Sequence, residues 1–376
     1  MTSNADFSIP EEILPHDGRF GSGPSLVRKD AVAALAEISP TYLGTSHRQE
    51  PVRAMVAKLL DGLRHLFSLP EDWEIIIGNG GSTLFWDAAT FCLIENSSQH
   101  LVFGEFSSKF AHAVSATPHL ATPEIIESEP GTAPSMYKSD VDTYALTHNE
   151  TSTGVSIPLK RISGISAEDA LILVDATSAA GGMTWEPSQV DCYYFAPQKS
   201  FASDGGLWLA ACSPNAISRI ERIASSNRWI PAGLDLNIAL QNSRKNQTYN
   251  TPSLTTIFLT AHQVEWINEN GGLDWAASRC AQSSEFIYQW AEEHEYAKPF
   301  VSDPDLRSPV VATIDLDDAI SADDVIEACR SNGILDIGGY RKLGRNQLRI
   351  ATFPAIEFDD VQLLTKSLDY LIGKML

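Results

Sequence analysis

Short apolar segments alternate with amphipathic segments along the first two-thirds of the chain. Hydrophobic residues recur at helical spacing between Val52 and Phe67, and further helices are predicted over 29–37, 84–94, 107–116 and 215–224. Runs typical of buried strands occupy 73–77, 101–103, 124–127, 144–147, 171–174, 191–195 and 207–211. Such alternation is typical of a mostly parallel sheet covered by helices on both faces, so the sequence predicts an α/β fold.

The last third of the chain follows a different pattern. Residues 230–250 are polar, which indicates a long ordered loop or an excursion toward a dimer contact. Beyond it the sequence predicts helices over 254–267, 273–293, 321–332 and 359–374, and strands at 310–314, 334–337 and 348–351. A chain of 376 residues is too long for one simple core. We therefore expect a large domain over residues 20–260 and a smaller α+β domain formed by 1–19 and 261–376.

Composition narrows the classes of partner and compartment. The formal net charge of −21 argues against a nucleic-acid or anionic membrane surface, but a small anionic substrate needs only a local basic cluster. The five cysteines are scattered without a CxxC pair, which favours reduced thiols in a cytoplasmic protein over disulfides or a metal site. No secretory signal or membrane-length apolar run is apparent, so neither is expected.

A lysine and an aspartate follow two of the predicted strands. Lys199 comes shortly after the aromatic run at 191–195, where a lysine is either a solvated surface residue or an amine whose pKa burial lowers. Asp175 ends the run at 171–174. A pyridoxal-phosphate site needs these two groups, a Schiff-base lysine and a carboxylate partner for the pyridinium nitrogen.

A glycine-rich turn lies between a predicted strand and a predicted helix. Its sequence, residues 78–83, can direct backbone N–H groups and a helix N-terminus at a phosphate, although a purely structural turn fits it equally well. Ligands of parallel sheets bind at the carboxyl ends of the strands, and this turn, Asp175 and Lys199 all fall there. The shared edge favours a cofactor held among the three.

Separate motifs along the chain resemble those of the phosphoserine aminotransferases, which are fold-type I pyridoxal-phosphate enzymes of class V. They extend over nearly the whole chain, and its dimensions resemble actinobacterial members. The motifs are Phe20-Gly21-Ser22-Gly23-Pro24, Ser46-His47-Arg48, Asn79-Gly80-Gly81-Ser82-Thr83, Gly104-Glu105-Phe106, Asn149-Glu150-Thr151, Asp175, Gln198-Lys199, Tyr249-Asn250-Thr251-Pro252, Gly339-Tyr340-Arg341 and Arg349.

The resemblance implies roles for these residues. Lys199 would be the Schiff base and proton shuttle, and Asp175 would pair with the ring nitrogen. Further cofactor contacts would come from Ser82, Thr83, Phe106, Thr151, Gln198 and, from a second subunit, Asn250 and Thr251. Arg349 would hold the substrate carboxylate, and the substrate phosphate would lie near His47, Arg48, Tyr340 and Arg341.

Two positions depart from the family pattern. Many members have histidine where this chain has Tyr340 and arginine where it has Thr83, which leaves the substrate-phosphate pocket less basic. Some motif residues also have ordinary structural explanations: Phe106 can be core, and Thr151 can form a turn. Cys329 would be the nucleophile of a related cysteine desulfurase, but its place in an amphipathic helix favours a buried thiol.

The implied activity is reversible amino transfer between glutamate and 3-phosphohydroxypyruvate, giving O-phospho-L-serine and 2-oxoglutarate. This is the transamination step of serine biosynthesis, and pyridoxine biosynthesis uses a related phosphorylated substrate. The implied assembly is a homodimer with active sites at its interface. Two alternatives stay open. One is another class V enzyme of the alanine–glyoxylate or serine–pyruvate type, which needs no second anion site, and the other is a non-catalytic protein that binds pyridoxal phosphate.

Overall fold

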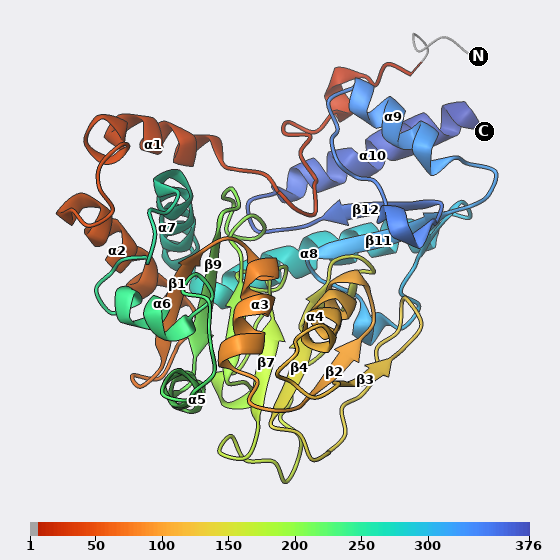
Figure 1. The fold of residues 1–376 in the computed structure, drawn as a ribbon. Coiled ribbons are helices and arrows are strands. Elements are labelled where there is room, and N and C mark those ends of the chain that lie inside the picture. Colours follow the sequence, from red (N-terminus) through yellow and green to blue (C-terminus); the bar gives the residue numbers. More distant parts are fainter. Residues whose placement is uncertain (1–6) are drawn as a thin grey trace.

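A seven-stranded sheet forms the centre of the molecule in the computed structural model, which describes residues 7–376 (Figure 1). The strand order is β1-β9-β8-β7-β4-β2-β3, and β9 is antiparallel to β1 and β8 while the remaining pairs are parallel. This confirms the predicted α/β fold with a mixed, mostly parallel sheet. The strands are β1 (Glu74–Asn79), β2 (Ser98–Val102), β3 (Glu124–Glu127), β4 (Thr143–Thr147), β7 (Leu171–Asp175), β8 (Cys192–Phe195) and β9 (Leu207–Cys212).

Helices cover both faces of this sheet, as the near-continuous burial of its strands requires. One face packs against α3 (Ser82–Cys92), α4 (Glu105–Ser115), α5 (Pro214–Ala224) and α6 (Leu236–Ser243). The other packs against α2 (Glu50–Leu66) and α7 (Leu254–Glu269), and α1 (Lys29–Tyr42) lies on α7.

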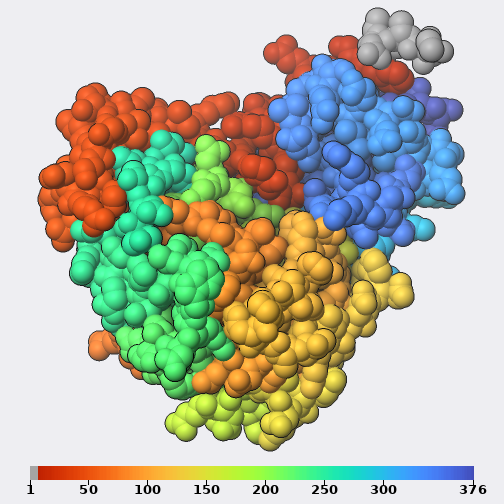
Figure 2. Space-filling view, in the orientation of Figure 1, coloured from red at the N-terminus to blue at the C-terminus, as the bar shows by residue number. Residues whose placement is uncertain are grey.

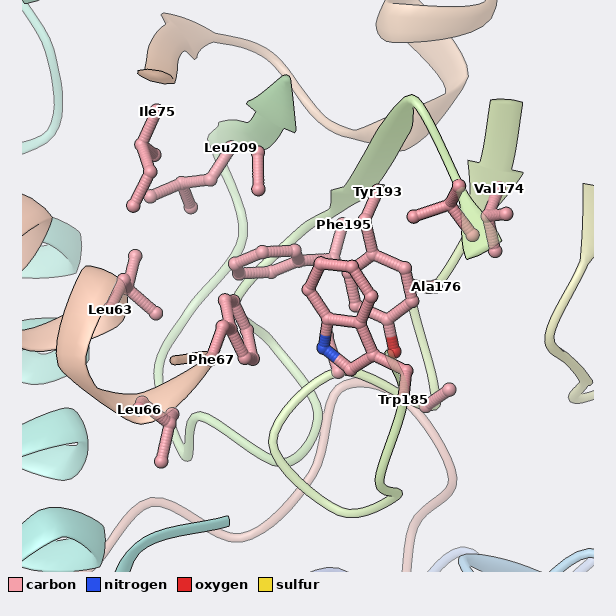
Figure 3. Packing of buried hydrophobic residues seen from close by; sticks show 14 of the residues in the cluster. Leu63, Leu66, Phe67, Ile75, Val174, Ala176, Trp185, Tyr193, Phe195 and Leu209 are labelled. Atoms are coloured by element: carbon pink, nitrogen blue, oxygen red, sulfur yellow. The ribbon is translucent and has the colours of Figure 1, made fainter. Parts of the chain in front are cut away.

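Alternate residues of β8 enter these two layers, since side chains of a strand point to opposite faces. Tyr194 stacks on Phe85 of α3 at a ring distance of 4.3 Å, whereas Tyr193 stacks on Trp185 on the opposite face at 4.0 Å. Phe67 places its ring edge against Tyr193 and Phe195 (Figure 3). These rings fix the end of β8, and so the starting point of the loop that carries Lys199.

A smaller antiparallel sheet lies in the C-terminal third, with β10 (Ala297–Pro299), β11 (Val311–Leu316) and β12 (Gln347–Ala351). It packs with α8 (Gly272–Glu293), α9 (Ala322–Ser331) and α10 (Phe358–Met375), and Figure 2 shows this part, in blue, above the yellow segment that includes α4. The N-terminal turn η2 (Glu11–Ile13) also packs on α10. The division at residue 260 stays a prediction, and residues 1–6 of the expected small domain lie outside the described residues.

Two local expectations differ from the structure, and several short elements were not expected. The polar stretch expected as a loop contains α6, because the Asp235 side chain caps it and Leu236 and Leu240 are buried. Within the strand expected at 334–337, Leu335 forms an isolated bridge to Arg19, and the next residue after this range, Gly338, forms one to Leu348. Elements that the sequence did not predict are the hairpin β5 (Asn149–Glu150) and β6 (Val155–Ser156), strand β10, and the short turns η3 (Pro187–Gln189), η4 (Pro304–Leu306) and η5 (Arg341–Leu343).

Candidate active site

A cavity of about 310 Å³ lies at the carboxyl ends of the parallel strands, as the strand-end positions predict. Its walls come from the Gly23-Pro24 turn and from the carboxyl ends of β1, β2, β4, β7 and β8 with the segments that follow them. The structure thus brings together residues from distant parts of the chain. The predicted site residues that line the cavity are Ser82, Thr83, Phe106, Thr151, Asp175, Gln198 and Lys199.

Lys199 is held in a fixed position inside this cavity. Its side chain is only 7% exposed, and Nζ donates hydrogen bonds to the Ser22 carbonyl at 2.8 Å and the Thr151 hydroxyl at 3.1 Å. Burial, and then the charge of Arg349, lowers the pKa of Lys199 to about 7, while Asp175 and Glu150 oppose the shift. A large fraction of the amine is therefore neutral near pH 7, and only a neutral amine has a lone pair for a nucleophilic attack.

A glycine makes room for this amine. Gly23 has a φ of +141°, and a Cβ atom there would lie 2.9 Å from Lys199 Cε and 3.0 Å from Nζ. Any other residue would be strained and would press on the lysine. The Gly-Ser-Gly-Pro turn, which has no phosphate-loop lysine, thus serves as one wall of the cavity.

Asp175 ends β7 and is 4% exposed. Its Oδ1 accepts hydrogen bonds from the backbone N–H and the hydroxyl of Thr177, and its Oδ2 accepts one from Trp86 Nε1 at 2.9 Å. Burial raises the pKa of Asp175, while these hydrogen bonds and the charge of Lys199 oppose the rise. The carboxylate is therefore oriented on both oxygens, as a partner for a ring nitrogen needs to be.

Sequence reasoning missed Thr177 and Trp86, although both line the cavity. Thr177 carried a usable signal, because a hydroxyl residue two positions after an aspartate favours a turn closed by the carboxylate. Trp86 follows Ser82 by one helical turn, so both lie on the same face of α3. That register would have indicated a second cavity residue on this helix.

The start of α3, which also lines the cavity, offers groups that suit a phosphate. Helix α3 begins at Ser82 with no side-chain cap on Gly81, so the first N–H groups have no intrahelical acceptor. Gln198 Oε1 and Asn149 Oδ1 are buried without hydrogen-bond partners, although both residues line the cavity. Buried polar atoms of this kind indicate a polar ligand. Amine, carboxylate, aromatic wall and helix N-terminus together fit pyridoxal 5′-phosphate.

Arg349 lies beside the cavity in the small sheet. Its NH1 donates to the Thr151 carbonyl at 3.2 Å, its Nε is buried without a partner, and burial lowers its pKa. The Tyr340 ring lies 6.0 Å from the Phe106 ring and 5.4 Å from the Arg349 guanidinium carbon. Arg341 instead lines a second cavity, next to Gln347.

The remaining predicted residues lie away from the lysine in this single chain. Arg48 NH1 donates to Gln247 Oε1 at 3.0 Å, and His47 is buried with Nε2 unpartnered. Burial, and then the charge of Arg48, lowers the pKa of His47. The carbonyls of Asn250 and Thr251 accept hydrogen bonds from the Asn79 side chain. These four residues are not among those that line the cavity.

Other chemistry receives no support from the described residues. Cys329 is fully buried in α9, and burial raises the pKa of its thiol to about 12, so the predicted buried thiol is confirmed. Within residues 7–376, histidine, cysteine and acidic side chains form no cluster of three that could hold a metal ion. Over the same residues, no helix has the length and apolarity needed to cross a membrane.

Comparisons with known proteins agree with this geometry. The family described as aminotransferase class-V matches residues 125–341. A phosphoserine aminotransferase from a Nocardioides species is 54% identical over 368 residues, covering 98% of each chain, and one from Rhodococcus jostii is 53% identical with the same coverage. The crystal structure of a phosphoserine aminotransferase from Cytophaga hutchinsonii has a TM-score of 0.83 at 23% identity, covering 94% of this chain and 99% of that one.

Fold, cavity and family match together define an aminotransferase of class V that uses pyridoxal 5′-phosphate. Within this class, identity above 50% over the full length identifies the particular branch. The chain belongs to the phosphoserine aminotransferase family.

Proposed function

We propose that this protein transfers an amino group reversibly between glutamate and 3-phosphohydroxypyruvate, yielding O-phospho-L-serine and 2-oxoglutarate, the transamination step of serine biosynthesis. The observation that carries the proposal is the buried Lys199 amine, which shares one cavity with Asp175 and the N-terminus of α3. When bound there, pyridoxal phosphate supplies an aldehyde that combines with amines and a ring that accepts electrons from the substrate Cα.

The chain's own residues hold that group and move the proton. With a pKa near 7, Lys199 Nζ can both accept and return a proton at the substrate Cα under neutral conditions. Asp175 would keep a proton on the ring nitrogen of the bound cofactor. Phe106 would hold the ring from one side, and Lys199 Nζ lies 5.8 Å from the Phe106 ring centre. The Thr151 hydroxyl, which accepts a hydrogen bond from Lys199, would contact the phenolic edge of the ring.

The cofactor phosphate is held at the start of α3. The backbone N–H groups of Ser82 and Thr83 point along the helix axis toward it, where the helix dipole favours an anion. Gln198, which lines the cavity, would add its side-chain NH₂ group as a donor to the phosphate. Asn250 and Thr251 of a second subunit complete this pocket.

Substrate selection rests on arginines, whose planar guanidinium groups pair with two oxygens of a carboxylate or phosphate. Arg349, with its unpartnered Nε beside the cavity, holds the α-carboxylate. His47 and Arg48 bind the substrate phosphate across the interface of a homodimer, together with Arg341 and the adjacent Tyr340. Within one chain, His47 and Arg48 do not line the cavity around Lys199, which supports a site completed by two subunits. Five buried, unpaired cysteines support a reducing, cytoplasmic setting.

The experiment that tests the assignment compares Lys199→Ala with wild type. The wild-type protein should be yellow with cofactor, bleach on addition of glutamate, and recover its colour with 3-phosphohydroxypyruvate. Lys199→Ala should lose turnover and the borohydride-dependent fixation of the cofactor, because no amine is left to attach it. Lys58→Ala, which removes a surface lysine paired with Glu265, should behave as wild type.

Retained turnover in Lys199→Ala would contradict the assignment of Lys199 as the Schiff-base lysine. A wild-type protein that bleaches with alanine or serine but not with glutamate would instead indicate the alanine–glyoxylate or serine–pyruvate type. No bleaching with any amino acid would indicate a protein that binds the cofactor without catalysis.

A further inference from the structure

Glu150 is a fully buried acid that the proposed chemistry does not use. It ends β5, directly before Thr151, and is 0% exposed. Its hydrogen bonds come from neutral donors of two segments. Oε2 accepts from Phe106 N–H at 3.1 Å, from Ser107 N–H at 2.9 Å and from the Ser107 hydroxyl at 2.9 Å. Oε1 accepts from the Ser152 N–H and hydroxyl at 3.2 and 2.7 Å.

These contacts make Glu150 the cap of α4. The helix begins at Glu105 after Gly104, whose missing side chain cannot supply a cap. A carboxylate from a distant strand occupies that place, and a Cβ atom on Gly104 would lie 2.3 Å from Glu150 Cγ. The glycine and the acid are therefore matched to each other. The turn they fix carries Phe106, the aromatic wall of the cofactor cavity.

The use of a charged group here requires a reason. A carboxylate loses its hydration on burial, and none of its five hydrogen-bond donors carries a compensating charge. A glutamine amide would avoid that cost, but it has one accepting oxygen, and its NH₂ group would face donors that now bond to the second carboxylate oxygen. The cations that gain from the charge are those of the site, since the Glu150 carboxylate acts to raise the pKa of both Lys199 and Arg349, against the larger effect of burial.

We propose that Glu150 is a positioning residue for the cofactor, which locks Phe106 against the cavity and supplies negative charge beside Lys199 and Arg349. The residues next to it take part in the same arrangement. Thr151 accepts from Lys199 through its hydroxyl and from Arg349 through its carbonyl. One short hairpin thus links the aromatic wall, the amine and the guanidinium.

Two substitutions separate the two parts of this role in the protein reconstituted with pyridoxal 5′-phosphate. Lys199 is faced by Arg349, Asp175 and Glu150, and Glu150→Gln removes one of the two negative charges. A positive charge on the lysine nitrogen becomes less stable, so the pH midpoint of the bound cofactor's visible absorbance should fall by about one unit. Glu150→Asp keeps the charge and this midpoint. Its shorter side chain cannot reach α4, so the cofactor dissociation constant should rise about tenfold in equilibrium dialysis as Phe106 is released.

Asp142→Asn is the matched control. Asp142 also accepts hydrogen bonds from three backbone N–H groups, but it precedes β4 and so lies at the opposite edge of the sheet. This variant should lower thermal stability and leave the midpoint and the dissociation constant unchanged.

An unchanged midpoint in Glu150→Gln, or a wild-type dissociation constant in Glu150→Asp, overturns the corresponding part of the proposal. Equal changes in Asp142→Asn overturn both. If Glu150→Gln does not fold, the dissociation constant of Glu150→Asp still tests the position of Phe106 and keeps the proposal falsifiable. The inference rests on the cofactor pocket of the proposed function and not on its substrate. Lack of phosphoserine turnover by wild type would refute the substrate assignment while both readouts stayed measurable.

Discussion

The cavity around Lys199 and the surface around Arg48 differ in how much of each site one chain supplies. The lysine, its aspartate and the phosphate-binding turn are anchored at strand ends and lie in one enclosed space. Arg48 lies just before α2 at an exposed position, where its guanidinium donates a hydrogen bond to Gln247. Under the proposed function, one chain supplies the cofactor site, and a second copy of the chain would complete the substrate site.

The difference follows from the architecture. A parallel sheet brings the ends of its strands to one edge, so residues far apart in sequence meet without help from another subunit. Loops and helix starts are not gathered at such an edge. Functional groups on them would form a site when another surface, such as a second subunit, packs against them. Substitutions at the cofactor site should therefore have large effects on turnover. Substitutions at the substrate site should have effects that also depend on the subunit assembly.

The largest effect is expected on the cofactor side, from Asp175→Asn. An amide cannot hold a proton on the ring nitrogen, so turnover should fall by about 10²- to 10⁴-fold, the range typical for loss of an electrostatic or acid–base group. Steady-state kinetics with glutamate and 3-phosphohydroxypyruvate measure this change. Asp191→Asn is the control, because Asp191 is equally buried but precedes β8 and so lies at the far edge of the sheet. A turnover within twofold of wild type in Asp175→Asn would contradict the assignment.

An intermediate effect is expected on the substrate side, from Arg48→Ala. Loss of one charge-assisted hydrogen bond costs about 2 kcal/mol, so KM for phosphoserine should rise roughly 30-fold. An unphosphorylated amino acid should show no such change. Arg53→Ala, which removes a nearby arginine bonded to the Lys245 carbonyl, should leave both KM values unaltered. If Arg48→Ala impaired both substrates equally, the phosphate pocket would have to be sought elsewhere.

The smallest effect is expected from Trp86→Phe, which keeps an aromatic ring but removes the hydrogen bond to Asp175. One such bond contributes about 1 kcal/mol, so cofactor affinity should fall about fivefold. Fluorescence titration with pyridoxal phosphate can measure this. Trp208→Phe removes an indole from the same hydrophobic cluster and should leave affinity unchanged. Equal affinity in wild type and Trp86→Phe would show that Thr177 alone orients the carboxylate.

Much of the sheet and of the cofactor site could be predicted from sequence, because the end of a strand is visible in a short stretch of residues. The positions of Lys199 and Asp175 followed from apolar runs that end in a charged residue. Trp86 could not be found in this way, because its indole meets Asp175 only through the packing of α3 on the sheet. The role of Glu150 could not be predicted either, because this residue caps α4 from a distant strand and the sequence around α4 does not indicate it. The missed helix α6 shows that a capping aspartate and two buried leucines outweigh a polar composition.

The place of β9 in the sheet bears on how the protein is made. Within the described part of the chain, residues 74–79 pair with residues 207–212 alone, and the Gly80 N–H donates to the Gly206 carbonyl at 2.9 Å. The turn that receives the phosphate thus finds its neighbouring strand only after Cys212 has been synthesised. Contacts of such long sequence separation carry a loop-closure cost and slow folding. Pyridoxal phosphate, which would bind at this turn, should therefore stabilise the completed fold as a ligand.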